Sequence, residues 1–526
     1  MKKPSVIDDR PEQLRPPVLK EVGVTESERY LAILAEKSFL NLWSYPSPYR
    51  DQKTGGNGRG DGKELCDLLV VCGDHIIIFS EKNIEWPSGE LTVAWGRWVK
   101  RAVMAAAKQA KGAERWIEEH PNRIFLDRNC ENPFPIDLPE PEKRKFHHVI
   151  VARGASDQCK KHFEGHSGSL MIQPSLKGNM NWPKDPSTAT PFAIGDASPD
   201  GSFVHVLDDV SLDIVMQELD TVRDFTDYLE KKEEFVRSGR LLRAHGEENL
   251  LAYYAIRINK EGDHDFVVDD ASAPITISHD HYRNWISDPQ YLAKKEADKI
   301  SYVWDEFITL FTDHMLNGTS ITLDDHKFEL SRNEIGVRYM ALEMRFRRRS
   351  HGEAIMGALE RGITHNPFFR MMMSPAGARD NETAFFIMTF KYQDWMEEKG
   401  GYEQYRRKRT ERAMNYAHGV LEKYPHLKRI VGISREPPKQ GRGVSEDLVY
   451  AEQCDWSDEE RQQIRENCKE LGVLQQPLKM RPVDDDEYPE LTQIIFERPD
   501  TPRMAMPNRK QRRKQAAKKR KAGRRK

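Results

Sequence analysis

Acidic and basic side chains gather at one end of the stretch ELCDLLVVCGDHIIIFSEK, residues 64–82. Gly73-Asp74 is a preferred two-residue turn, so the apolar runs on either side of it are expected to form a β-hairpin. This pairing sets Asp67 opposite Ser80, and side chains alternate between the two faces of each strand. Asp67 and Lys82 are therefore expected to project from the same face at the open end of the hairpin.

Carboxylates beside a lysine at a strand end are suited to phosphodiester hydrolysis. That reaction needs a divalent cation to polarise the phosphoryl oxygen and acidify the attacking water. Mg²⁺ takes carboxylate oxygens and keeps several waters, so two acids suffice, and a lysine can offset charge in the transition state. The sequence predicts Asp67 and Glu81 as ligands of Mg²⁺ or Mn²⁺ and Lys82 as the cation that orients the water. Glu28, on the preceding helix, is a candidate third acid.

Helices and further strands are expected around this hairpin. The stretch 25–43 has helical spacing, with Thr25 and Glu28 as a capping box. Residues 93–120 form a long run of good helix formers, which ends before Pro121. Strands are expected at 122–127 and 146–156, and the latter places His147 and His148 on opposite faces, so at most one can enter a site. The order of elements predicts an α/β core of about 150 residues.

From Thr25 to Ala155 the chain resembles the restriction-endonuclease-like nucleases, the PD-(D/E)xK superfamily, and within it the nuclease-related NERD type. Those proteins share an acid-bearing helix, a strand with Asp, a hairpin, a strand ending in Glu-x-Lys, and then a helix with more strands. Carried over residue by residue, Glu28 matches the helix acid, Asp67 the metal-binding aspartate and Lys82 the lysine. Gln109 falls where many members place a polar residue that faces the site.

The resemblance departs from the family pattern at Ser80, which stands at the family's Glu position. The acid has moved to Glu81, and strand alternation turns that side chain to the opposite face. A β-bulge at residues 80–81 would restore it to the site. Alternatively, Glu64 or Glu36 supplies the missing oxygen, or the site no longer binds metal. The resemblance thus implies a metal-dependent nuclease acting on DNA or RNA, of the phage-defence or accessory kind; the alternative is a catalytically degenerate module for nucleic-acid binding or assembly.

Ordinary structural roles also account for the single residues. An aspartate at a strand entrance is commonly a turn residue, and Glu81-Lys82 resembles a solvated strand end. Glu28 is explained as the acid of a capping box, and Gln109 as a polar residue on the outside of a helix. The functional hypothesis depends on the joint order of these elements.

The whole chain of 526 residues is expected to be α/β (α+β), with a restriction-endonuclease-like mixed sheet and a larger helix-rich C-terminal region. We expect a flexible leader at 1–20, the nuclease domain at 21–165, a linker and helical segment at 166–245, and a C-terminal domain at 246–500. Within these, residues 165–200 are expected to be a linker or long loop, and 250–258 and 264–270 are candidate strands.

A basic tail ends the chain at 501–526. From Arg503 onward there are 13 lysines and arginines and no acids, against 82 basic and 84 acidic residues in all. The body is therefore acidic, and the tail is expected to be disordered and to bind phosphates. The predicted nucleic-acid-binding residues are Arg509, Lys510, Arg512, Arg513, Lys514, Lys518, Lys519, Arg520 and Lys521. The basic stretch Arg345–Gly362 offers either a second contact surface or a salt-bridged helix face.

Composition bounds the class of protein. Hydrophobic residues make up 38% and charged residues 32% of the chain, values typical of a soluble globular protein. No run approaches the roughly 18 apolar residues of a membrane helix, and the N-terminal residues do not resemble a signal peptide. The six cysteines are scattered, as expected of reduced thiols in the cytoplasm. The expected partner is nucleic acid, with DNA favoured over RNA, no membrane, and a homo-oligomer as a further possibility.

Overall fold

A mixed five-stranded sheet forms the centre of the N-terminal half of the chain. The computed structural model describes residues 14–51, 62–268, 273–322, 328–374, 380–438, 445–475, 483 and 486–489. The sheet has the order β1-β4-β5-β7-β10. Its strands are β1 (Ser44–Pro46), β4 (Leu68–Cys72), β5 (His75–Asn83), β7 (Lys145–Arg153) and β10 (Val204–Leu207). In the first three strands of this order each runs antiparallel to its neighbour, whereas β5, β7 and β10 are parallel.

The hairpin of β4 and β5 has the register that its turn predicts. Cys72 pairs with His75 and Leu69 with Ile78, around a turn at Gly73-Asp74 in which Gly73 has a positive φ of 61°. Every residue of β4 is buried, because helices cover both faces of the sheet. This burial fits the apolar runs 68–72 and 76–79, and the polar residues of the hairpin lie at its turn and at its open end.

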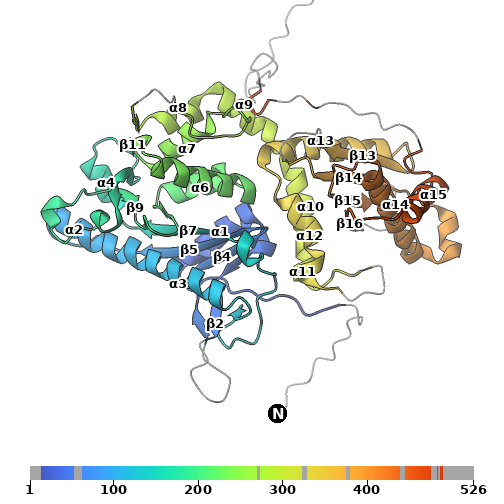
Figure 1. Cartoon of the computed structure of the whole chain (residues 1–526), viewed down its shortest axis with the longest axis horizontal. Coiled ribbons are helices and arrows are strands. Elements are labelled where there is room, and N and C mark those ends of the chain that lie inside the picture. Colours follow the sequence, from blue (N-terminus) through green and yellow to red (C-terminus); the bar gives the residue numbers. More distant parts are fainter. Residues whose placement is uncertain are drawn as a thin grey trace, which may run out of the picture.

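Helices lie on both faces of this sheet (Figure 1). On one face lies a long helix formed by α2 (Leu91–Val99), a π-helical turn (Lys100–Met104) and α3 (Ala105–Glu119), which packs against β5 and β7. On the other face, α1 (Glu26–Phe39), α5 (Ser211–Glu218) and α6 (Val222–Arg237) pack together, with Phe39 and Phe79 both contacting Phe225. The predicted capping box of α1 is present, and Thr25 accepts from the backbone N–H of Glu28 at 3.2 Å.

The chain is α+β, as predicted, and its described residues form three further sheets. Their orders are β12-β11-β8-β9, β13-β14-β15-β16 and β3-β2-β6. The strands are β2 (Tyr49–Asp51), β3 (Gly62–Glu64), β6 (Ile124–Phe125), β8 (Met171–Lys177), β9 (Ala193–Asp196), β11 (Leu241–Ala244), β12 (Ile275–Ile277), β13 (Phe368–Met373), β14 (Thr383–Thr389), β15 (Arg429–Arg435) and β16 (Glu446–Glu452).

A second lobe is built on the sheet of β13 to β16, and helices join it to the first lobe (Figure 1). One hydrophobic core runs from the central sheet to residues Phe385 and Val431 of the second lobe, and a second core lies under α14. The remaining helices are α4 (Ser156–His162), α7 (Glu247–Ala255), α8 (His281–Ser287), α9 (Pro289–Asp298), α10 (Tyr302–Leu316), α11 (Leu330–Asn333), α12 (Ile335–Ala341), α13 (Arg345–Gly362), α14 (Gly401–Lys423) and α15 (Asp458–Glu470).

Three local predictions were wrong. Residues 165–200 contain the strands β8 and β9, although their Gly, Pro and Ser content indicated a loop. The apolar run 250–258 lies largely in helix α7, not in a strand; all its helical residues are buried, so no amphipathic period marks it as a helix. Residues 264–268 make one isolated bridge, from His264 to Ile258, in place of a strand. The expected domain boundaries stay predictions, and β10 adds a strand from beyond residue 165 to the central sheet.

The basic helix α13 resolves the alternatives posed for residues 345–362. Arg345 forms ion pairs with Asp220 at 2.8 Å and with Asp305 at 2.6 Å, and Arg349 pairs with Asp298 at 2.7 Å. Arg345, Arg348 and Arg349 are all buried. These arginines therefore join helices inside the protein and offer no surface to nucleic acid.

The six cysteines are free thiols, as predicted. Across the described parts of the chain, every helix is too short or too polar to span a bilayer.

Candidate active site at the open end of the central hairpin

Asp67 is the centre of the polar cluster at the open end of the hairpin. It precedes β4, and its side chain is only 4% exposed. One carboxylate oxygen accepts from the backbone N–H of Glu81 at 2.5 Å, and the other accepts from the side-chain amide of Gln109 at 3.4 Å. Gln109 in turn accepts from the hydroxyl of Ser80 at 3.1 Å. Helix α3 and strand β5 therefore hold the carboxylate from two sides.

Lys82 approaches the same carboxylate from the solvent side. Its ammonium lies 3.5 Å from Asp67 Oδ2 and donates to the backbone carbonyl of Glu81 at 2.8 Å, while 29% of the side chain is exposed. Burial raises the pKa of Asp67 above its usual range, and the positive charge of Lys82 and the N–H of Glu81 oppose that rise. Asp67 and Lys82, 15 residues apart in the chain, thus meet as the sequence predicted.

Glu81 is turned away from Asp67 and Lys82. Its carboxylate accepts from Arg153 Nε at 2.5 Å, on the face of the sheet that α1 covers, where Arg153 also lies over the ring of Tyr30. The register of β5 with β7 is regular from His75 to Asn83, so β5 has no bulge at residues 80–81. Ser80 therefore faces Gln109, and Glu81 contributes its backbone N–H to the cluster while its side chain faces the opposite layer.

Two other acids lie near Asp67. Burial, followed by the charge of Asp67, raises the pKa of Glu64, and a hydrogen bond from the Ser47 hydroxyl opposes that rise. Glu28 lies within electrostatic range of both Asp67 and Glu64, and its carboxylate accepts from the backbone N–H groups of Val24 and Thr25 at 2.7 and 3.1 Å. The charge of Glu36, the remaining alternative, raises the pKa of Lys20 against the larger, opposite effect of burial, so this carboxylate lies within electrostatic range of Lys20.

The donors of this cluster fit a hard cation. Asp67 and Glu64 supply carboxylate oxygens, and burial raises the pKa of both, so a cation beside them would offset the cost of burying their charges. Mg²⁺ requires only one or two carboxylates, because waters and substrate oxygens complete its octahedron. Within the described part of the chain, however, the set of three residues whose ligand atoms all lie within 4.8 Å of one another is His75, His147 and Glu230, at the other end of β5.

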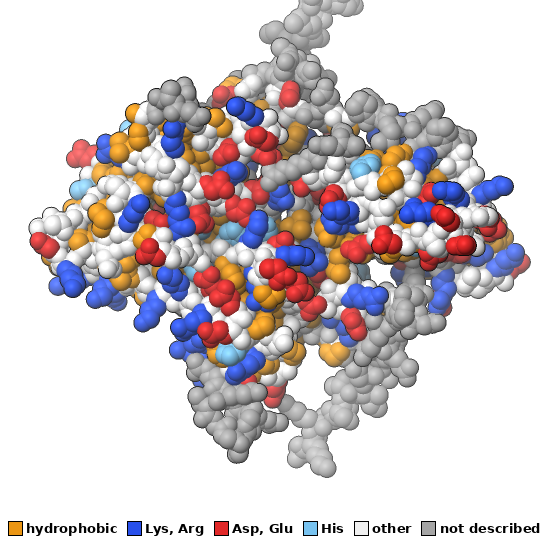
Figure 2. All heavy atoms as spheres, in the orientation of Figure 1, with side chains coloured by type: hydrophobic (Ala, Val, Ile, Leu, Met, Phe, Trp, Pro, Cys, Tyr) orange, Lys and Arg blue, Asp and Glu red, His pale blue; other side chains and the backbone are white. Residues whose placement is uncertain are grey.

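Sequence reasoning missed a basic surface beside this cluster. The outer face of α2 and α3 carries exposed cations, which gather along one edge of the molecule in Figure 2. They are Arg97, Lys100, Arg101, Lys108, Lys111 and Arg115. Most of them are separated by three, four or seven residues, a readable signal for a single helix face, whereas the site residue predicted on this segment was Gln109.

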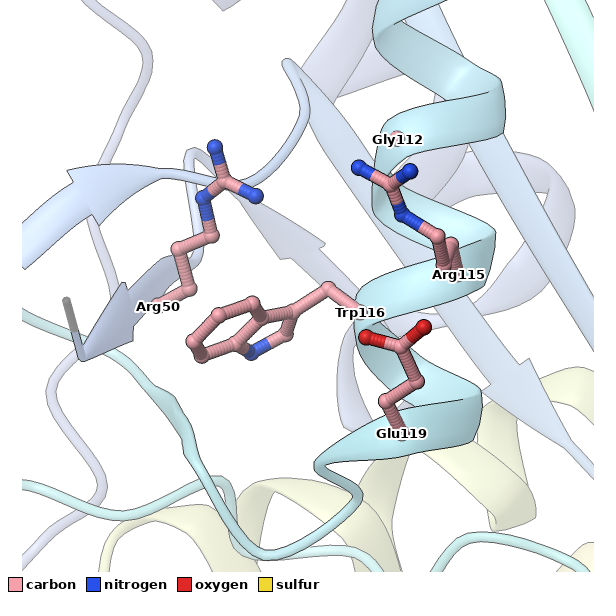
Figure 3. Close-up of a pocket in the computed structure, with 5 residues that line it drawn as sticks. All are labelled: Arg50, Gly112, Arg115, Trp116 and Glu119. Carbon is pink, nitrogen blue, oxygen red and sulfur yellow. The ribbon is translucent and has the colours of Figure 1, made fainter.

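A pocket of about 290 Å³ adjoins this surface, lined by Arg50, Gly112, Arg115, Trp116 and Glu119. Figure 3 shows Arg50 reaching in from β2, with the other residues coming from α3. The guanidinium carbon of Arg50 lies 5.2 Å from the ring centre of Trp116, and its buried Nε has no partner. Gly112 and Trp116 follow Gln109 at helical spacing, so the pocket continues along the same side of α3 that touches Asp67.

The predicted arm at 501–526, with the cations from Arg509 to Lys521, lies outside the described residues. Comparisons with models of protein families, with curated proteins and with solved structures give no match to this chain.

Proposed function

We propose that this chain is a metal-dependent nuclease whose centre is the cluster around Asp67 and Lys82. The observation that carries the proposal is the 3.5 Å approach of Lys82 to Asp67 at the open end of a buried hairpin, with Gln109 beside them. The order of elements supports the resemblance to restriction-endonuclease-like proteins: helix α1 is followed by the antiparallel strands β1, β4 and β5, then by helix α3 and the parallel strand β7.

Asp67 and Glu64 are the residues that would hold Mg²⁺ or Mn²⁺, in place of the pair Asp67 and Glu81. When bound, such a cation supplies an acidified water and stabilises charge on the phosphoryl group. The backbone N–H of Glu81 and the amide of Gln109 fix the orientation of the Asp67 carboxylate. Lys82 is partly exposed and anchored on the carbonyl of Glu81, so its ammonium can orient a water or face a scissile phosphate.

The basic surface on α2 and α3 supports a polyanionic substrate. Phosphate contacts supply most of the non-specific affinity for nucleic acid, and arginine binds phosphate oxygens with two parallel N–H groups. Arg50 and Arg115 both line the pocket, and within the described part of the chain no ion pair joins either of them to an acid. Burial, followed by the charge of Arg115, lowers the pKa of Arg50, so a phosphate placed between the two guanidinium groups would relieve their repulsion. We assign this pocket to a backbone phosphate of DNA in preference to RNA, next to the bond that is cut.

The predicted tail would add a flexible arm for the same substrate, and pairing of two chains would allow cleavage of both strands. Neither changes the assignment of the centre.

The second candidate is a module that binds nucleic acid without cutting it. The pairing of Glu81 with Arg153 favours this function, because the acid nearest to the family's ligand position is then engaged by an arginine and does not face a metal. The low exposure of Asp67 favours it too, since Lys82 then acts as a fixed counter-charge to a structural carboxylate.

Cleavage assays decide between the two. Supercoiled plasmid, linear duplex DNA and RNA are incubated with the full chain and Mg²⁺, Mn²⁺ or EDTA. We expect cleavage with either metal and none with EDTA, and loss of cleavage in Asp67→Asn and in Lys82→Met. Asp74→Asn is the matched control, because it lies in the exposed turn at the opposite end of the same hairpin. Retention of nucleic-acid binding with no cleavage in the wild type would instead establish the second candidate.

A further inference from the structure

We propose that His75, His147 and Glu230 form a binding site for a transition-metal dication of the Zn²⁺ type. We call this set the imidazole site. It lies where β5 and β7 begin, whereas Lys82 stands near the end of β5, seven residues further on. At a rise of about 3.3 Å per residue, the two sites are about 23 Å apart. The imidazole site is therefore separate from the proposed nuclease centre.

The parallel pairing of β5 and β7 brings the two imidazoles together. Lys145 pairs with His75 and His147 pairs with Ile77, so His75 and His147 project from the same face of the sheet. That face is covered by α6, on which Glu230 lies. His148 projects from the opposite face and binds Glu114 of α3 at 2.9 Å, as the alternation of the strand predicted.

The ligand atoms are spaced as a tetrahedral metal requires. Zinc binds imidazole nitrogen and carboxylate oxygen at about 2.0–2.1 Å, so two ligands of a tetrahedron lie about 3.3 Å apart. His75 Nδ1 lies 3.0 Å from His147 Nε2 and 3.8 Å from Glu230 Oε1, and all three ligand atoms are within 4.8 Å of one another. The observed separations bracket the tetrahedral edge, and shifts of under an ångström would bring the three atoms onto one ion.

Both imidazoles are neutral, as metal ligands must be. Burial lowers the pKa of His75 to about 3, with Lys145 and Arg223 acting in the same direction, and burial lowers the pKa of His147 to about 3 as well. Each neutral ring has one nitrogen with a lone pair, and the ring that donates in the His75–His147 hydrogen bond must move its proton to its other nitrogen to bind a metal. Nitrogen donors select zinc, cobalt or nickel over magnesium, which prefers an all-oxygen shell.

Without a metal, hydrogen bonds satisfy the same atoms. One imidazole donates to the other, and Lys145 binds Glu230 Oε1 at 2.9 Å, the oxygen that faces His75. Lys145 therefore competes with a metal for this oxygen. Since half of its side chain is exposed, it can swing into solvent when an ion binds.

The test uses the untagged full chain after treatment with EDTA and dialysis. Zn²⁺ binding is measured by calorimetry, and Co²⁺ is added as a probe whose visible absorption reports tetrahedral coordination. We expect one high-affinity site and weakening of at least about tenfold in Glu230→Gln, since even outer-sphere partners contribute that much. Glu234→Gln, one turn further along α6 and exposed, is the matched control and should bind as the wild type does.

A second variant tests the proposal by a gain of Zn²⁺ affinity. Lys145→Met removes the competitor for Glu230, so Zn²⁺ affinity should rise by several-fold, a result that damaged folding cannot imitate. The rings of His166, His245 and His279 also lie close together and are the rival site, which His279→Gln disrupts. Absence of a stoichiometric site would overturn the proposal. So would a site that His279→Gln abolishes, or one that Glu230→Gln and Lys145→Met both leave unchanged.

Discussion

Replacing Asp67 by asparagine should remove activity without weakening the fold. Burial raises the pKa of Asp67, so the folded protein favours its neutral form. A carboxyl group of this kind contributes stability below its unfolded pKa, and that contribution is lost as the pH rises through the folded pKa. At neutral pH the ionised Asp67 is therefore a burden on the fold, and a neutral isostere relieves it.

The contacts of Asp67 set the size of the effect. Asparagine keeps an oxygen to accept from the N–H of Glu81, and it gives up the pairing with Lys82 at 3.5 Å. A pair with a partly exposed lysine is worth about 0–1 kcal/mol. With the desolvation of the charge removed, we expect the free energy of unfolding to stay within about 1 kcal/mol of the wild type. Loss of the charge that would hold the cation should reduce cleavage by about 10²–10³-fold, the range seen when one electrostatic stabiliser of a transition state is removed.

Asp208 offers a matched contrast, because it is equally buried and has a structural role. Its two oxygens accept from the backbone N–H groups of Leu170, Val210 and Ser211 and from two hydroxyls. In Asp208→Asn the amide would face a donor, at a cost of about 3 kcal/mol. At about 2–4 °C per kcal/mol, its Tm should fall by about 6–12 °C, with cleavage per folded molecule unchanged.

Differential scanning calorimetry and plasmid cleavage on the same samples test both variants. The reasoning is refuted if Asp67→Asn lowers the Tm as far as Asp208→Asn does, because Asp67 would then be a structural carboxylate. Undiminished cleavage by Asp67→Asn would equally remove it from the nuclease centre.

Three further predictions concern the substrate and the acids. The double variant Arg50→Gln with Arg115→Gln should lose two phosphate contacts. The slope of log affinity against log salt concentration should therefore become less steep by about 1.8, as measured by fluorescence anisotropy in EDTA. Lys423→Gln, at an exposed position of the second lobe, is the control and should leave this slope unchanged. Cleavage should disappear on acidification at a pH above the ordinary carboxyl range, because burial raises the pKa of both Asp67 and Glu64 and each must be ionised to hold a cation; a pH profile that is flat down to pH 4 contradicts this. Deleting 503–526 should weaken binding and flatten its salt dependence while leaving the pH profile of cleavage unchanged, and an unaltered slope would refute the arm.

Local chemistry made part of the fold and site predictable. The Gly73-Asp74 turn sets the hairpin register, and the register alone places Asp67 opposite Ser80 and sends Glu81 to the other face. The capping box of α1 and the opposed faces of His147 and His148 follow from equally short-range rules. Each of these predictions depends on neighbours within one turn or one strand.

Contacts distant in sequence could not be predicted. Glu81 finds Arg153 72 residues away, and Glu230 reaches His75 from a helix that lies beyond β7. The strands β8 and β9 form because their sheet also takes β11 and β12, whose partners local composition does not reveal. The all-round burial of α7 removes the periodicity that would identify it.

Donors of different character lie near the two ends of β5, and this affects how metal dependence must be assigned. Oxygen donors at Asp67 and Glu64 suit a weakly held, exchangeable Mg²⁺, whereas the imidazoles of His75 and His147 suit a firmly held transition metal. EDTA removes both ions, so loss of cleavage in EDTA does not by itself identify the ion that acts on the phosphate. Restoration by Mg²⁺ in a chain that carries Glu230→Gln does identify it, because that variant weakens the imidazole site and leaves the residues around Asp67 unchanged.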